Sequence, residues 1–232
     1  MASSERQISI VGRLGVFPST RLTLPSRRIL AFLALYERPV SRGLAADRLW
    51  PDQPDQQARA SLRRALWQTP AEWVRSTGDQ LEIDATVDLP AAHRTAARAL
   101  DGGELTLTDI ETLSEDILPG WHEEWVLPVQ DSFHLLRVQA LEAACVTMAT
   151  AGHFALATQA GTAALAAEPL RESAAMALIR AHLLEGNRYA AARRFRDFCR
   201  ALHAELGVAP SPGLVAAIEG GDTDTASRAS LS

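Results

Sequence analysis

Hydrophobic and polar residues change their pattern several times within the first 90 residues. Between Gln7 and Leu24 they alternate loosely among turn-forming glycine, proline and serine, which predicts short antiparallel strands. From Pro25 onward apolar residues recur every three or four positions, which predicts a helix, and Ser41 is a good N-cap for a second one. Arg75, a Thr-Gly-Asp turn and a short apolar run then predict a hairpin. This order of elements is typical of a winged helix-turn-helix.

A third helix is predicted between the second helix and the hairpin, with Asp55 as a candidate N-cap. Four apolar residues form its inward-facing stripe: Ala58, Leu62, Ala65 and Leu66. At about 100° per residue, arginine and glutamine occupy the outward positions. Thr69-Pro70 is expected to end the helix.

The outward face of this third helix is a candidate DNA-reading surface, because arginine and glutamine can pair bidentately with guanine or adenine edges in the major groove. Base recognition is expected from Arg59, Arg63, Arg64 and Gln68, with Gln56 on the same surface. Phosphate contacts are expected from Arg27, Arg28, Arg42 and Arg75. Acidic residues beside Arg75 weaken the hairpin as a contact surface: Asp79, Glu82 and Asp84. The alternative is that these arginines form only a solvated helix face.

The second half of the chain has helical patterns throughout, so the predicted fold class is mainly α with a small β component. Residues 91–100 form a short predicted helix, and Gly152 and Gly186 each end a later one. These glycines are 34 positions apart, which is the tetratricopeptide period. We expect a winged-helix domain, a tetratricopeptide-like repeat domain and a disordered tail, at residues 7–90, 91–218 and 219–232 respectively.

Two apolar stripes at helical spacing agree with the repeat. The first consists of Val138, Leu141, Cys145 and Met148, and the second of Ala192, Phe195, Cys199, Leu202 and Leu206. Tyr189 and Ala192 stand one residue late relative to Phe154 and Ala157 of the first unit. Both cysteines are therefore expected in the core.

Charge is distributed unevenly along the chain. All 23 basic residues are arginine and the net charge is −5, but residues 1–75 carry +6 and residues 76–232 carry −11. This asymmetry predicts that the N-terminal part meets a polyanion. A second basic cluster is more simply explained as a solvated helix face: Arg188, Arg193, Arg194, Arg196 and Arg200.

Catalytic and metal-binding patterns are absent from the sequence. Without lysine there is no Gly-Lys-Ser/Thr phosphate loop, and the six histidines lack zinc-type spacing. We expect no enzyme activity, no cofactor and no metal. No apolar run is long enough to cross a membrane and the first residues lack a secretion signal, so a cytoplasmic protein is expected.

Several segments resemble the Streptomyces antibiotic regulatory proteins. They are Leu24-Pro25-Ser26-Arg27-Arg28, Pro39-Val40-Ser41-Arg42, Leu49-Trp50-Pro51, residues 58–66, Val87-Asp88-Leu89, Leu118-Pro119-Gly120-Trp121 and residues 205–211. The resemblance covers about residues 7–218. It implies a winged-helix DNA-binding domain joined to a bacterial transcriptional activator domain.

The same resemblance implies partners and a role. Protomers are expected side by side on direct repeats near promoters, where they recruit RNA polymerase including its sigma factor. The regulated genes would belong to antibiotic or other secondary-metabolite clusters. The competing hypothesis is a tetratricopeptide adaptor whose N-terminal domain no longer binds DNA, which the acidic hairpin and the overall negative charge favour.

Overall fold

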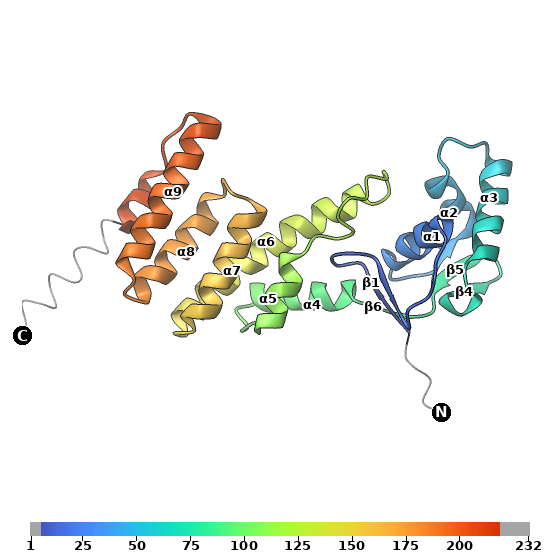
Figure 1. Cartoon of the computed structure of the whole chain (residues 1–232), viewed down its shortest axis with the longest axis horizontal. Helices are drawn as coiled ribbons and strands as arrows, with labels where there is room; N and C mark the ends of the chain where they lie inside the picture. Colours follow the sequence, from blue (N-terminus) through green and yellow to red (C-terminus); the bar gives the residue numbers. More distant parts are fainter. Residues whose placement is uncertain (1–5, 219–232) are drawn as a thin grey trace, which may run out of the picture. The chain divides into compact units, whose positions relative to one another are not determined.

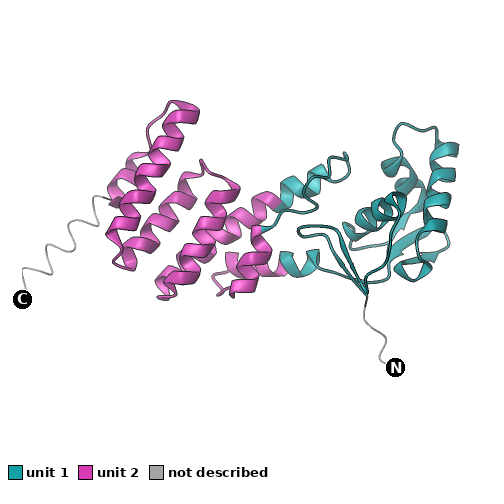
Figure 2. Ribbon diagram, in the orientation of Figure 1, with its two compact units in different colours: residues 1–93, 115–133 teal, residues 94–114, 134–232 magenta. Residues whose placement is uncertain are grey.

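The computed structural model describes residues 6–218, which divide into two compact units (Figures 1 and 2). Within the described residues, unit 1 comprises residues 6–93 and 115–133, and unit 2 comprises residues 94–114 and 134–218. The fold class is as expected, with helices throughout and two small sheets in unit 1. The tail expected at residues 219–232 lies outside the described residues.

The first sheet of unit 1 holds both ends of the N-terminal fold together. β1 (Gln7–Ser9) pairs antiparallel with β2 (Gly15–Phe17) and parallel with β6 (Thr86–Val87). Directly after β6, the Asp88 carboxylate accepts hydrogen bonds from the backbone N–H groups of Ile10 at 2.9 Å and Val11 at 3.2 Å. Burial raises the pKa of Asp88 despite these bonds. The Val87-Asp88-Leu89 segment thus ties the strand after the hairpin to β1.

The three predicted helices of unit 1 are present in order. They are α1 (Leu24–Ala34), α2 (Arg42–Leu49) and α3 (Asp55–Gln68). Ser41 caps α2 as expected, because its side chain accepts a hydrogen bond from the Leu44 N–H at 3.2 Å. The expected cap at Asp55 is wrong: Pro54 holds the N-cap position and Asp55 is the first helical residue. Its carboxylate still favours the helix start, where the macrodipole is positive.

A hairpin follows α3 and forms the second sheet. After η1 (Ala71–Trp73), β4 (Val74–Thr77) pairs antiparallel with β5 (Gln80–Ile83), which pairs in turn with β3 (Val40–Ser41). Gly78 in the turn has φ +59°, a conformation that glycine adopts without strain. Three helices followed by this hairpin make a winged helix-turn-helix.

Unit 1 also contains a segment that the sequence suggested for the second domain, residues 115–133. The backbone N–H of Leu118 donates to Ile10 at 2.9 Å, and the Trp125 ring meets Phe32 of α1 edge-on with centroids 5.3 Å apart. Trp125 is 7% exposed and Phe32 is fully buried. A division of the chain at residue 90 would remove this segment from unit 1.

Unit 2 is helical throughout its described residues. α4 (Leu89–Leu100) and α6 (Leu127–Thr150) each begin in unit 1 and continue in unit 2. The remaining helices are α5 (Leu107–Ser114), α7 (Phe154–Ala167), α8 (Glu172–Leu184) and α9 (Arg188–Leu206).

Gly152 and Gly186 occupy equivalent turns, as the 34-residue spacing predicted. Both have φ values near +84° and each follows the helix end by two residues. In both turns the residue after the glycine donates its backbone N–H to a carbonyl oxygen of the preceding helix. His153 donates to Met148 and Asn187 donates to His182, each at 2.8 Å. The helix pairs α6–α7 and α8–α9 are therefore successive repeat units.

The register of the second helical repeat, α8–α9, differs from the expectation. Ala157 and Ala191 are both fully buried and are 34 residues apart, so Ala191 and not Ala192 is the equivalent residue. Tyr189 was expected as the counterpart of Phe154, but its side chain is 74% exposed, so this expectation is wrong. The buried residues of α9 are Ala191, Phe198 and Leu202, whereas Cys199 is half-buried and Leu206 is 59% exposed. The first stripe, from Val138 to Met148, is fully buried as expected.

A glycine allows the repeat helices to approach closely. A Cβ on Gly161 of α7 would lie 2.9 Å from Cys145 Sγ on α6 and 3.1 Å from Leu178 of α8. Cys145 is fully buried here, and burial raises the pKa of its thiol to about 12. These three helices therefore form one packed layer.

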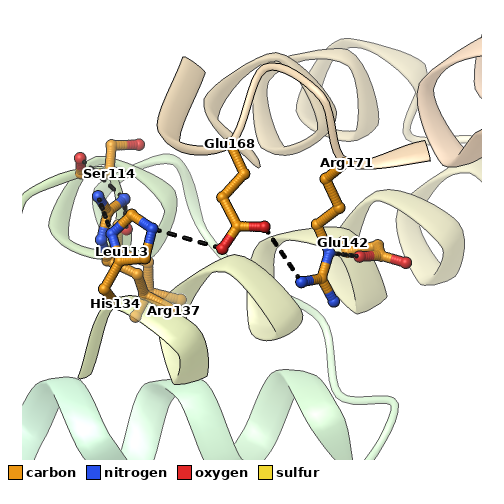
Figure 3. A network of polar contacts seen from close by, with 7 residues as sticks. All are labelled: Leu113, Ser114, His134, Arg137, Glu142, Glu168 and Arg171. Atoms are coloured by element: carbon orange, nitrogen blue, oxygen red, sulfur yellow. Dashed lines mark hydrogen bonds and ion pairs between the residues drawn. The ribbon is translucent and has the colours of Figure 1, made fainter. Parts of the chain in front are cut away.

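Ion pairs join the helices of unit 2 around Arg171 (Figure 3). Arg171 Nε lies 2.8 Å from Glu142 Oε2 of α6, and its Nη1 lies 3.3 Å from Glu168 Oε2. The other oxygen of Glu168 lies 3.5 Å from His134 Nε2. Arg137 donates to the carbonyl oxygens of Leu113 and Ser114 at 3.4 Å. Arg171 therefore links the start of α8 to α6, and Arg137 links α6 to the end of α5.

Candidate nucleic-acid interface

The surface of α3 is divided into a buried and an exposed face. Ala58, Leu62 and Ala65 are each at most 2% exposed and pack into unit 1. Leu66, expected in the same stripe, is only half-buried. All predicted base-reading residues are exposed, namely Gln56, Arg59, Arg63, Arg64 and Gln68. The helix ends at Gln68 as expected, because Pro70 follows and Thr69 turns its hydroxyl back to the Ala65 carbonyl at 2.8 Å.

Three arginines on this face have no protein partner among the described residues. Arg59, Arg63 and Arg64 make no hydrogen bond or ion pair there. Each guanidinium therefore keeps all five N–H donors for solvent or a ligand. An exposed helix with three such groups is a surface of positive potential with planar, forked donors.

Gln68 and Arg27 border this face. The amide oxygen of Gln68 accepts a hydrogen bond from Thr23, the N-cap of α1, at 3.3 Å. Arg27 in the first turn of α1 is exposed, and its side chain makes no hydrogen bond or ion pair with a described residue. The structure thus brings the start of α1 next to the end of α3.

Two predicted phosphate contacts, Arg28 and Arg42, bind protein groups instead of pointing freely into solvent. Arg28 donates to the Leu49 carbonyl at 2.9 Å, and its Nε lies 3.5 Å from Glu123 Oε1. Arg42 donates to Ser76 Oγ of β4 at 2.6 Å. Arg28 holds α1 to the end of α2, and Arg42 holds the start of α2 to the hairpin.

Arg75 in the hairpin is surrounded by carboxylates. Its Nη1 lies 2.9 Å from Glu82 Oε1 and its Nη2 forms a very short contact with Asp84. These charges, Asp84 first, raise the pKa of Arg75 above its usual value. Asp84 also accepts from Arg6 at 2.8 Å. The positive charge at the base of the wing is therefore largely neutralised within the protein.

The exposed face also includes Trp67, which its polar pattern does not predict as part of the site. It is 86% exposed, the highest value among the large hydrophobic residues of the described chain. The signal was present in the helical period, because Trp67 stands two positions after buried Ala65 and so about 200° around the helix. An indole in this position is an apolar surface in the middle of a basic one.

Metal-binding clusters and membrane-spanning helices do not occur among residues 6–218. No group of three or more histidine, cysteine, aspartate or glutamate side chains there could hold a metal ion. None of the described helices is both long and apolar enough to cross a membrane. The exposed face of α3 is therefore the strongest candidate site in the described chain.

A winged helix with an exposed basic third helix, followed by helical repeats, defines the class of protein by its fold. The model of the bacterial transcriptional activator domain matches residues 74–220. This match covers more than half of the chain, so the chain belongs to the family of proteins that carry a bacterial transcriptional activator domain. Members of this family are transcriptional activators and are typically not enzymes.

One solved structure supports the fold along nearly the whole chain. It is that of Mycobacterium tuberculosis EmbR in complex with a low-affinity phosphopeptide, with a TM-score of 0.65 and 19% sequence identity. The match covers 98% of this chain and 70% of the EmbR chain. At this identity the likeness concerns the fold alone. No curated protein sequence matches the chain.

Proposed function

We propose that this protein is a sequence-specific DNA-binding activator of transcription of the Streptomyces antibiotic regulatory type. α3 enters the major groove of a promoter, and no cofactor or metal takes part. The protein acts in the cytoplasm, at the nucleoid, on genes of a secondary-metabolite cluster. Membership of the activator-domain family supports this function, and the likeness to EmbR supports the fold that it requires.

One observation carries the proposal: the guanidinium groups of Arg59, Arg63 and Arg64 are exposed on one helix and have no partner among the described residues. Arginine that forms ion pairs within the protein stabilises the fold. Unpaired arginine on the second helix of a helix-turn-helix remains available for base edges and phosphates. Gln56 lies on the same face, and Gln68 and Arg27 at its border extend the surface.

The helical repeats suit a different task. The described residues of unit 2 carry arginine and carboxylate in equal numbers, ten of each, so this unit has no net positive charge to attract DNA. Stacked helix pairs present extended surfaces for protein contacts. We assign to them the contacts between protomers bound side by side on direct repeats, and the recruitment of RNA polymerase with its sigma factor.

A second candidate is a repeat-type adaptor whose winged helix does not bind DNA. The neutralised wing favours it, because Arg75 is held by Glu82 and Asp84 and offers little charge to a phosphate. The α3 face disfavours it, since the arginines there are not neutralised in the same way. The two candidates differ in whether the full chain selects a DNA sequence.

The test is a selection from random-sequence duplex DNA with the full chain at physiological salt. We expect one sequence class to be enriched and bound at least about 10³-fold more tightly than a scrambled duplex, the usual margin of a specific reader. A scrambled duplex of equal composition is the control for purely electrostatic binding. Binding of both duplexes with equal affinity, or of neither, would show that the adaptor is the better description.

A further inference from the structure

Trp67 is the most exposed large hydrophobic side chain in the described chain, and it lies on the helix proposed to read DNA. A tryptophan left in water exposes a large apolar area that folding normally buries. In the described residues the indole makes no ring contact, and its Nε1 makes no hydrogen bond. The indole is therefore free to contact a partner from outside unit 1.

The neighbours of Trp67 on the helix surface indicate the chemistry of that partner. Residues three and four positions earlier face the same direction, and these are Arg64 and Arg63. One step further along the same line stand Ala60, which is small enough to allow a close approach, and Gln56. A protein partner would have to cover two unpaired guanidinium groups, whereas DNA presents anionic phosphates and base acceptors to them.

Trp67 stands in the last turn of α3, and this decides which part of DNA it meets. The last carbonyl groups of a helix carry partial negative charge and so disfavour a phosphate there. An apolar group is not repelled in this way. The only apolar group that base pairs present in the major groove is the C5-methyl of thymine.

We propose that Trp67 is a specificity-determining residue that packs its indole against the methyl group of a thymine in the target sequence. This inference rests on the proposed DNA-reading function of α3. Arg63 and Arg64 position the helix beside it and read neighbouring bases. Trp67 adds a preference for thymine at one position near the C-terminal end of α3.

Deoxyuridine provides the test, because it differs from thymidine only in lacking this methyl group. Each thymine of the enriched duplex is replaced in turn, and the dissociation constant of the full chain is measured. The wild-type protein should lose about fourfold in affinity at one position, the factor for burying one methyl-sized group. Trp67→Ala should bind the thymine and uracil duplexes equally, and Trp67→Phe should keep part of the difference.

Tyr189→Ala is the matched control, since Tyr189 is also an exposed aromatic residue on a helix but belongs to unit 2. It should discriminate like the wild type. Circular dichroism should show that Trp67→Ala unfolds at the wild-type temperature, because the side chain is solvated.

The outcomes separate this inference from the proposed function. If no duplex is enriched, the DNA-reading function itself fails. If a duplex is enriched but deoxyuridine has no effect, or Trp67→Ala keeps the wild-type preference, the thymine contact is wrong. If Trp67→Ala instead dissociates a dimer in sedimentation experiments and leaves the preference intact, the occupant of this surface is a second copy of the chain.

Discussion

Two helices of this protein carry clusters of exposed arginine, and they differ in what surrounds the charge. On α3 of unit 1, Arg59, Arg63 and Arg64 have no protein partner among the described residues. On α9 of unit 2, Asp197 lies amid the cluster, 3.8 Å from Arg193 and in a short contact with Arg200. The Arg200 hydrogen bond is the main reason that the pKa of Asp197 is lowered.

The comparison shows that a count of arginines does not define a nucleic-acid interface. α9 contains more arginine than α3, yet its cluster encloses a carboxylate, and Arg196 returns a hydrogen bond to the Ala192 carbonyl at 3.3 Å. The described residues of unit 2 as a whole hold as many carboxylates as arginines, so the cluster on α9 lies in a unit without net positive charge. Unneutralised charge on a helix that the fold exposes is the better criterion.

The largest expected effect distinguishes these two helices directly. Arg63→Ala combined with Arg64→Ala removes two unpaired guanidinium groups, and at about 1–3 kcal/mol for each base contact the enriched duplex should be bound at least about 30-fold more weakly. Arg194→Ala combined with Arg196→Ala removes the same charge from α9 and should change the affinity by less than about twofold. Equal losses in the two double variants would mean that net charge alone drives binding.

A smaller effect separates two neighbouring arginines of α1. Arg27→Ala should weaken binding about threefold for every DNA sequence and reduce the salt dependence by about 0.9 in the logarithmic slope, as expected for one lost phosphate contact. Arg28→Ala should leave that slope unchanged. It should lower the free energy of unfolding by about 1–2 kcal/mol, because Arg28 bonds the Leu49 carbonyl and faces Glu123. Salt titrations and urea denaturation measure the two effects.

Finding the reverse, a slope change for Arg28→Ala and a stability loss for Arg27→Ala, would contradict the assignment of these residues. The two arginines were expected from the sequence to play the same role, as phosphate contacts. The difference between them is expected only from the structure. Only the packing of α1 against α2 and residues 115–133 distinguishes them.

Elements fixed by local signals could be predicted from the sequence. Ser41 as a cap, the turn around Gly78, the end of α3 before Pro70 and the equivalent glycines 152 and 186 all depend on residues close together in the chain. The exposed face of α3 followed from helical periodicity alone. These parts of the fold, and the exposure of this face, were predicted correctly.

Contacts between distant residues could not be predicted in this way. The parallel pairing of β1 with β6, the packing of Trp125 on Phe32, and the carboxylate that faces Arg28 depend on tertiary structure. The error in α9 has a related cause: Phe195 and Cys199 fit a helical stripe, but the face that packs on α8 is centred on Ala191 and Phe198. Trp67 was not predicted as part of the site, because its indole lacks the paired donors and acceptors that mark the other residues of that face.

The most direct test of the role of α3 compares both arginine clusters in the unaltered protein. Phenylglyoxal modifies accessible arginine, and mass spectrometry of the full chain with and without the enriched duplex gives the extent of modification at each position. Because DNA should bury the α3 face, we expect strong protection of Arg59, Arg63 and Arg64 and unchanged modification of Arg194 and Arg196. Unchanged modification of the α3 arginines in the bound state, or protection confined to α9, would contradict the assignment of α3 as the DNA-reading helix.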